Sequence, residues 1–204
     1  MVVSLDDEGS GSITSAGVVA SASDNCVLAD TSLSQTAFSC SDIGTVSVDV
    51  TVSDGAGHTD TQAADVIVED AMPPALTTRE TTLYLNAMGY AQLQATDVVN
   101  QATDNCNLAD TSLSQASFQC SDTGMVTIDV SLTDGAGNTT AQPADVFIKD
   151  TLAPEVDGHI DTTLYFGLNG QANLTASEML TYTYDNCGTA DTTISQSSFN
   201  CGDP

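Results

Sequence analysis

The cysteines are the residues of this 204-residue chain with the clearest chemical implication. There are six, in three pairs with one spacing, since each Asp-Asn-Cys sequence is followed 14 residues later by a second cysteine. An even number at a repeated spacing is typical of a disulfide framework made in an oxidising compartment. Zinc is the alternative, but the chain has no Cys-x-x-Cys sequence. The spacing therefore predicts three local disulfides, Cys26–Cys40, Cys106–Cys120 and Cys187–Cys201.

A second set of residues supplies oxygen atoms that suit a calcium ion, which prefers carboxylates, amide carbonyls and backbone carbonyls. Each Asp-Asn-Cys sequence offers a carboxylate and an amide, an Asp-Gly-Ala-Gly sequence follows in two places, and an aspartate precedes each linker. The alternative is that these side chains only cap turns by local hydrogen bonds. The candidate Ca²⁺ ligands are Asp24, Asn25, Asp54, Asp70, Asp104, Asn105, Asp134, Asn138, Asp150, Asp185 and Asn186.

Both sets belong to a sequence that repeats along the chain. Cys26, Cys106 and Cys187 recur at intervals of 80 and 81 residues, and the second cysteines recur at the same intervals. A fixed period of this length defines the fold unit of a tandem array. We therefore expect three repeats: residues 1–74, residues 75–154 and an incomplete third repeat, residues 155–204.

The elements that must position these residues are β-strands. Met125–Thr133 alternates apolar and polar residues, and Thr139–Ile148 is expected to return beside it after the Asp-Gly-Ala-Gly turn. Tyr90–Asp97 is predicted to be a strand and Val98–Asn105 an irregular segment. Short strands with frequent turns predict an all-β chain of tandem immunoglobulin-like antiparallel β-sandwich domains, the third one incomplete. The expected core faces are Val126, Ile128, Val130 and Leu132 in the second repeat and Val46, Val48, Val50 and Val52 in the first.

The charge of the chain excludes several classes of partner. The formal net charge is −26, and Arg79 and Lys149 are the only Lys or Arg residues. Nucleic-acid binding needs a cationic surface that displaces counterions, and an anionic membrane surface would repel this chain. The sequence also has no apolar run long enough to insert into a membrane. A strongly acidic chain repels itself unless cations or salt relieve the charge, which favours calcium or a saline medium.

Two further features concern the surface. Ile67 and Phe147 occupy the same place in two repeats and point away from the expected core, so they are candidates for a lateral contact or for packing under a loop. Asn138-Thr-Thr and Asn173-Leu-Thr match the acceptor pattern for N-glycosylation, at Asn138 and Asn173.

The order of these motifs resembles the extracellular immunoglobulin-like repeats of bacterial surface proteins, the hyaline-repeat and cadherin-like groups. The motifs are Asp-Asn-Cys, Phe-x-Cys-Ser-Asp-x-Gly, a Val-rich strand, Asp-Gly-Ala-Gly-Asn/His and Val-x-Val/Ile-x-Asp-x-x-x-Pro. The resemblance implies an exported β-sandwich array that serves as a stalk, adhesin or fibre, often with bound calcium. The first repeat departs from it, because His58 stands where the second has Asn138.

The expected function is structural: an extracellular fibre, filament or cell-surface stalk of disulfide-stapled, calcium-binding repeats. The alternative is an adhesin that binds glycan or a host surface. The expected partners are copies of the chain in a homopolymer or neighbouring repeats of a longer chain. The incomplete third repeat is either a truncation or is completed by a strand from another chain. An enzyme is not expected, because the same residues recur in every repeat, whereas an active site needs one special place.

Overall fold

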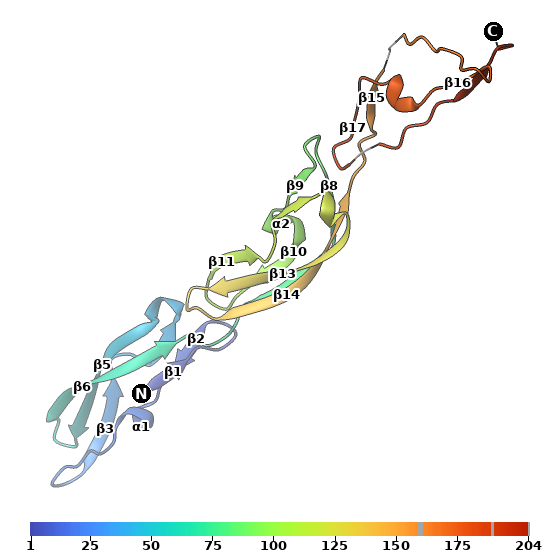
Figure 1. The fold of residues 1–204 in the computed structure, drawn as a ribbon. Coiled ribbons are helices and arrows are strands. Elements are labelled where there is room, and N and C mark those ends of the chain that lie inside the picture. The colour runs from blue at the N-terminus through green and yellow to red at the C-terminus, as the bar shows by residue number, and fades with distance from the viewer. Residues whose placement is uncertain (159–160, 189, 204) are drawn as a thin grey trace. The chain divides into compact units, whose positions relative to one another are not determined.

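The computed structural model describes residues 1–158, 161–188 and 190–203. These form two compact units, and each contains one junction between consecutive repeats. The first unit comprises Met1–Arg79, Ala95–Ser114 and Asp129–Ala144, and the second comprises Glu80–Gln94, Gln115–Ile128 and Asp145–Pro204. The described residues form sheets in every repeat (Figure 1), so the all-β prediction is confirmed. The predicted repeat boundaries are kept below as names for repeats 1, 2 and 3.

Repeat 1 has a four-stranded sheet of order β1-β6-β5-β3 and a two-stranded sheet of β2 and β4. A four-residue helix and a 3₁₀ turn complete it. The bounds are β1 (Val2–Ser4), β2 (Ser10–Ser12), α1 (Ser15–Val18), β3 (Leu28–Leu33), β4 (Ala37–Ser39), η1 (Cys40–Asp42), β5 (Gly44–Asp54) and β6 (Thr59–Glu69). Residues buried together come from both sheets: Val3, Leu5, Ile13, Phe38, Val48, Val66 and Val68.

Repeat 2 follows the same plan with one addition. Its large sheet has the order β11-β13-β14-β8, a second sheet pairs β12 with β9, and a third pairs β10 with β7. The bounds are β7 (Ala75–Thr78), β8 (Thr81–Tyr84), β9 (Tyr90–Gln92), α2 (Ala95–Val98), β10 (Val99–Thr103), β11 (Leu108–Leu113), β12 (Ser117–Gln119), η2 (Cys120–Asp122), β13 (Gly124–Asp134) and β14 (Thr139–Lys149).

The described part of repeat 3 has two small sheets, one of β15 and β17 and one of β16 and β18. The bounds are β15 (Glu155–Asp157), β16 (Gln171–Asn173), η3 (Ala176–Glu178), β17 (Tyr182–Tyr184) and β18 (Ser198–Asn200). Ala172 and Leu174 are its buried apolar residues among those described.

Alternation of apolar and polar residues produces the long strands. Along β13 the buried apolar residues are Ile128, Val130 and Leu132, and Val126 is half-buried, as predicted. Along β5 only Val48 is fully buried, whereas Val46, Val50 and Val52 are half-buried. Successive side chains of a strand point to opposite faces, so this burial pattern sets which face meets the core.

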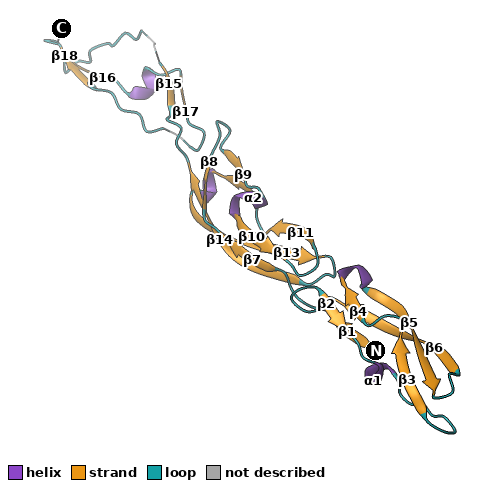
Figure 2. Cartoon of the chain, turned by 180° about the vertical axis from the view of Figure 1, so that it is seen from behind, coloured by secondary structure: helices purple, strands orange, loops and turns teal. Residues whose placement is uncertain are grey.

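Three details differ from the sequence-based expectation. Residues 99–103 form β10, not an irregular segment, because pairing with β7 overrides their polar composition. The predicted strand Tyr90–Asp97 ends at Gln92 and gives way to α2. Figure 2 shows the helical turns as short insertions among strands. The sheets are also not purely antiparallel, because β1 pairs with β6, and β8 with β14, in parallel; the rest of each repeat supplies the long crossover that parallel pairing needs.

Candidate metal centre and disulfides at the repeat junctions

The disulfides connect consecutive repeats, so the predicted local pairs are wrong. Cys40 pairs with Cys106 and Cys120 pairs with Cys187, at S–S distances of 2.01 and 2.13 Å. Cys26 and Cys201, predicted to pair with Cys40 and Cys187, are free and exposed. The second cysteine of each repeat thus bonds to the Asp-Asn-Cys cysteine of the next repeat.

The strand register explains why a local pair cannot form. Cys26 stands just before Leu28, which pairs with Asp54 at the end of β5. Cys40 begins the 3₁₀ turn that leads into Gly44, at the start of β5. The 11 residues of β5 separate its ends by about 33 Å, at roughly 3.3 Å per residue. A disulfide needs Cα atoms within about 7 Å, so the two cysteines of one repeat lie at opposite ends of its large sheet.

Each disulfide lies beside a glycine turn, which we call the acceptor turn. In the first junction this turn is Asp6–Gly9, closed by a 3.0 Å hydrogen bond from Gly9 N–H to Asp6 O. Asn105 Nδ2 donates to Asp6 O at 3.0 Å, and Asn105 O lies 3.5 Å from Cys40 Sγ. Gly9 has a φ of 71°, and a Cβ there would lie 2.7 Å from Asn105 O. Only glycine allows both the turn and the docking of the Asp-Asn-Cys sequence.

The second junction repeats these contacts. Its acceptor turn is Asn86–Gly89, closed by a 2.8 Å hydrogen bond from Gly89 N–H to Asn86 O. Asn186 Nδ2 donates to Asn86 O at 3.2 Å, and Asn186 O lies 3.1 Å from Cys120 Sγ. Tyr184 adds a hydrogen bond from its hydroxyl to Ala87 O at 2.8 Å. The acceptor turns were not recognised as part of a site in the sequence, although Gly9, Gly89 and Gly170 recur at the repeat period.

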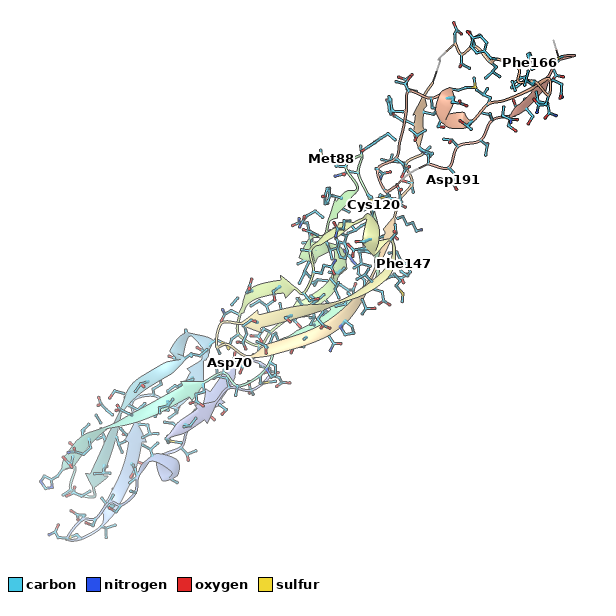
Figure 3. All side chains as sticks on the ribbon, viewed as in Figure 1. Asp70, Met88, Cys120, Phe147, Phe166 and Asp191 are labelled. Carbon is cyan, nitrogen blue, oxygen red and sulfur yellow. A yellow bond between two sulfur atoms is a disulfide. The ribbon has the colours of Figure 1, made fainter. Side chains whose placement is uncertain are left out.

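Three aspartates meet in the first junction, close to its disulfide. Asp70 follows β6, Asp104 follows β10, and Asp134 is the last residue of β13. One carboxylate oxygen from each lies within 4.8 Å of the other two. Asp70 and Asp134 are buried, at 7% and 2% exposure, and Asp104 is half-buried. Figure 3 labels Asp70 in this junction and Cys120 in the second.

Asp134 is held by the turn that it begins. Its Oδ1 accepts hydrogen bonds from the N–H groups of Ala136, Gly137 and Asn138, at 2.9, 2.7 and 2.8 Å. Burial raises the pKa of Asp134, but these bonds and the one from the Asn138 amide outweigh it, so its pKa lies below the usual value. Asp134 is therefore an ionised carboxylate at neutral pH.

Two asparagines tie the carboxylates together. Asn138 Nδ2 donates to Asp134 Oδ2 at 2.8 Å and to the backbone oxygen of Asp70 at 3.1 Å. Asn105 Nδ2 donates to Asp70 Oδ1 at 3.2 Å. The backbone oxygen of Asn107 accepts a 3.0 Å hydrogen bond from Gly135 N–H and so holds the turn after Asp134. Asn107 was not among the predicted ligands.

Two oxygen atoms of this cluster are buried and accept no hydrogen bond from the described residues. They are Asp104 Oδ1 and Asn105 Oδ1; the other Asp104 oxygen accepts from the N–H groups of Cys106 and Asn107. A buried oxygen without a donor costs free energy unless a cation or water supplies the missing partner. The three carboxylates and the Asn105 amide oxygen therefore form a ligand set made only of oxygen atoms, which fits a hard cation.

The second junction contains part of the same arrangement. Asn186 Nδ2 donates to Asp150 Oδ1 at 3.0 Å, as Asn105 does to Asp70. Asn186 Oδ1 is likewise buried and accepts no hydrogen bond from any described residue. Asp185 accepts from Cys187 N–H at 2.9 Å, in the manner of Asp104.

Two other candidate ligands of repeat 1, Asp24 and Asp54, accept hydrogen bonds within their own loops. Asp24 Oδ1 accepts from Cys26 N–H at 2.7 Å. Asp54 accepts from the N–H groups of Ala56 and His58 and from His58 Nδ1, the last at 2.8 Å, and these bonds lower its pKa. His58 thus contacts the Asp54 carboxylate as Asn138 contacts the Asp134 carboxylate, but His58 is exposed.

The remaining predicted sites are placed as follows. The amide of Asn138 is engaged in the junction, so a glycan there would have to replace those hydrogen bonds; Asn173 lies exposed in β16. Ile67 is 40% exposed and Phe147 is half-buried. Glycosylation and a lateral contact stay predictions.

Across the described residues, no helix combines the length and apolarity that crossing a bilayer requires.

No known protein family and no curated protein matches the chain. Solved structures do match. Human mucin-like protocadherin EC1-2 shares 10% identity at a TM-score of 0.31, over 58% of this chain and 76% of that one. The protocadherin GammaB4 extracellular domain shares 15% at 0.35, over 94% and 42%. The fibronectin(III)-like modules of Clostridium thermocellum CbhA share 10% at 0.28, over 73% and 89%. At these TM-scores the likeness does not extend to any site.

Proposed function

We propose that the chain is a structural, non-enzymatic segment of an extracellular fibre or cell-surface stalk, in which calcium and a disulfide join each repeat to the next. One observation carries this proposal: three aspartates from two consecutive repeats converge beside the disulfide that links those repeats. The disulfides support an oxidising, extracellular setting. Residues that join repeats provide connection, whereas catalysis would need a poised nucleophile or base.

The charge of the cluster supports a bound cation. At 4.8 Å, two carboxylates repel each other by about 3 kcal/mol for an effective dielectric constant of about 20. Within the described part of the chain, neither basic side chain, Arg79 or Lys149, forms an ion pair with the three aspartates, and the Arg79 guanidinium donates to the backbone oxygens of Thr96 and Asp97. A divalent ion would offset the repulsion and give Asp104 Oδ1 and Asn105 Oδ1 a partner.

Calcium fits the donor set better than magnesium. The oxygens come from three carboxylates and one amide on three separate loops, and Ca²⁺ accepts such irregular sets at high coordination number, whereas Mg²⁺ demands near-octahedral geometry. Asp70, Asp104, Asp134 and Asn105 would hold the ion directly, and Asn138 would orient Asp134. Since Asp70 belongs to repeat 1 and the others to repeat 2, the ion would resist separation of the two repeats.

Calorimetric titration and thermal unfolding test this assignment. Ca²⁺ at ten times its dissociation constant should stabilise the protein by about 1.4 kcal/mol, which raises the melting temperature by roughly 3–6 °C for a chain of this size. EGTA should reverse the shift, and Mg²⁺ should give a smaller one. Asp104→Asn should abolish the tight site, because it removes a charge and an unpartnered oxygen.

Asp24→Asn is the matched control, since Asp24 holds the position in repeat 1 that Asp104 holds in repeat 2 and lies outside the cluster of three aspartates. It should leave Ca²⁺ binding and the thermal shift unchanged. Equal loss in both variants, or an unchanged Ca²⁺ response in Asp104→Asn, would show that the cluster is not the site.

A further inference from the structure

The junctions are built from two complementary halves, and the described chain carries one unused copy of each. One half is an Asp-Asn-Cys sequence, and the other is an acceptor turn with its neighbouring cysteine. Three copies of each half exist, and the two disulfides use two of each. The unused halves are the acceptor turn Gly167–Gly170 with Cys201, and Asp24-Asn25-Cys26.

The unused acceptor half has the geometry of the occupied ones. Gly170 N–H donates to Gly167 O at 2.9 Å, against 3.0 and 2.8 Å in the occupied turns, and its φ is 71°. Cys201 Sγ lies 3.4 Å from Gly170 O, as Cys40 and Cys120 lie 3.7 Å from their glycine oxygens. Among the described residues, nothing occupies the position that Asn105 O and Asn186 O take elsewhere, since a Cβ on Gly170 would meet Cys201 Sγ alone of them, at 3.2 Å.

The unused Asp-Asn-Cys half is also formed in advance. Asp24 Oδ1 accepts from Cys26 N–H at 2.7 Å, and the corresponding bonds in the two occupied junctions are both 2.9 Å. Cys26 and its neighbour Val27 are exposed, with Val27 at 70%. Cys26 thus presents its thiol in the loop conformation that forms a disulfide twice elsewhere in this chain.

We propose that Cys201 of one chain bonds to Cys26 of a second copy, so that chains join head to tail through the junction that links the repeats within a chain. This deepens the proposed structural function by naming the partner and the bond. The contact is heterologous, since two different surfaces meet, and a heterologous contact that does not close into a ring adds copies without limit. Asn25 of the second copy would donate its amide hydrogen to Gly167 O of the first.

The bond forms by thiol–disulfide exchange with a small disulfide such as oxidised glutathione. The Cys201 thiolate attacks one sulfur of that disulfide, forms a mixed disulfide and releases one glutathione thiolate. The Cys26 thiolate of the second copy then attacks the Cys201 sulfur and releases the second glutathione thiolate. Two protein thiols are oxidised and one oxidised glutathione becomes two reduced ones, because the two protons lost by the protein thiols are taken up by the two released glutathione thiolates.

Two single-cysteine variants test the pairing directly. Cys26→Ser keeps only Cys201 as a free thiol, and Cys201→Ser keeps only Cys26. Each variant and their equimolar mixture are incubated in a glutathione redox buffer at about 0.15 M salt, which limits repulsion between acidic chains to a Debye length of about 8 Å. The products are resolved by non-reducing electrophoresis and intact mass. The native chain should give a ladder of covalent oligomers, and the mixture should stop at one heterodimer.

Specific pairing predicts at least tenfold more Cys26–Cys201 heterodimer than either homodimer, and peptide mapping should show both native disulfides retained. Asn25→Ala should reduce the heterodimer several-fold, while Asn100→Ala, at an exposed asparagine of β10 outside the junctions, should not. Statistical amounts of the three dimers, or a Cys26–Cys201 bond formed within one chain, would overturn the proposal. The readout does not involve calcium, so failure here is distinguishable from failure of the cation site.

Discussion

At the scale of single residues, the asparagine of the Asp-Asn-Cys sequence contributes as a donor. Asn105 Nδ2 bonds Asp6 O and Asp70 Oδ1, and Asn186 Nδ2 bonds Asn86 O and Asp150 Oδ1. The same two bonds therefore tie the next repeat both to the acceptor turn and to the linker aspartate. An aspartate at this position would accept where a donor is needed.

Asn105→Asp should destabilise the first junction in EGTA. It removes two hydrogen bonds of about 1 kcal/mol each and places a carboxylate against Asp70, so a loss of roughly 2–3 kcal/mol is expected in urea unfolding. Adding Ca²⁺ should recover part of this loss, because the new carboxylate is a ligand. Asn25→Asp provides the control and should have little effect; an equal loss in the two variants would contradict the role given to Asn105.

Asp42 gives a residue-scale prediction about pH. The Ser39 N–H donates to Asp42 Oδ2 at 2.8 Å and the Ser39 hydroxyl at 3.1 Å, and these bonds hold the pKa of Asp42 below its usual value. A carboxyl whose pKa is lower in the folded state stabilises the fold above its unfolded pKa of about 3.9. That contribution should disappear as the pH falls below about 4.

An NMR titration should therefore place the Asp42 midpoint below that of a model peptide. Asp42→Asn should remove this part of the pH dependence of stability while the native fold persists. An Asp42 midpoint at or above the peptide value would show that the hydrogen bonds of the turn do not favour the ionised form.

At the scale of elements, repeats 1 and 2 differ in how their long strands are covered. Val50 and Val52 of β5 line an open groove with Val18 and Val19, and residues 19–23 form no strand. The corresponding segment of repeat 2 is β10, paired with β7, and Val130 of β13 is fully buried there. The same sequence pattern thus yields a complete core face in one repeat and a partly exposed one in the other.

This difference predicts unequal costs for equivalent substitutions. Val130→Ala removes two fully buried methyl groups and should cost about 2 kcal/mol, combining transfer and cavity terms. Val50→Ala, at the half-buried equivalent, should cost less than half as much. Native-state hydrogen exchange assigns the loss to each repeat, which a single unfolding midpoint of a multi-repeat chain does not. Equal costs would show that the groove of repeat 1 is closed in solution.

The sequence predicted the long strands and the repeat, but not what depends on pairing between distant segments. Alternation in β13 and the Asp-Gly-Ala-Gly turn are local signals, and both correspond to the structure. β10 carries no such signal, because its strand conformation comes from pairing with β7. The candidate ligands could likewise be named from local motifs. The convergence of Asp70 with Asp104 and Asp134 could not, because it depends on the pairing of distant segments.

At the scale of the whole molecule, the disulfides make all three repeats one covalently cross-linked chain. The sequence separations of the bonded cysteines are 66 and 67 residues. The constant spacing of 14 residues suggested local loops. It instead corresponds to the stretch of chain that connects the two ends of a repeat. A periodic sequence cannot distinguish pairing within a repeat from pairing to the next, since both give the same spacings.

The long loops predict how much each cross-link stabilises the molecule. In the chain-entropy model a bond that closes the 66-residue separation restricts the unfolded state by about 4 kcal/mol, against about 3 kcal/mol for a loop of about 15 residues. The double variant Cys40→Ser with Cys106→Ser should therefore lose about 4 kcal/mol in urea unfolding. Replacing both partners avoids leaving a new free thiol that could exchange with the remaining disulfide.

Cys26→Ser is the control for this measurement, because Cys26 forms no disulfide within the chain and its replacement should leave stability unchanged. The two alternatives give opposite results: if the local pair Cys26–Cys40 existed in solution, Cys26→Ser would itself destabilise repeat 1 and free Cys40 for alkylation. Peptide mapping of the native chain under non-reducing conditions decides the same question independently, since the Cys40–Cys106 link joins peptides of two repeats. A junction held by this bond also keeps Asp70 near Asp104 and Asp134, so the double variant should bind Ca²⁺ more weakly even where both repeats remain folded.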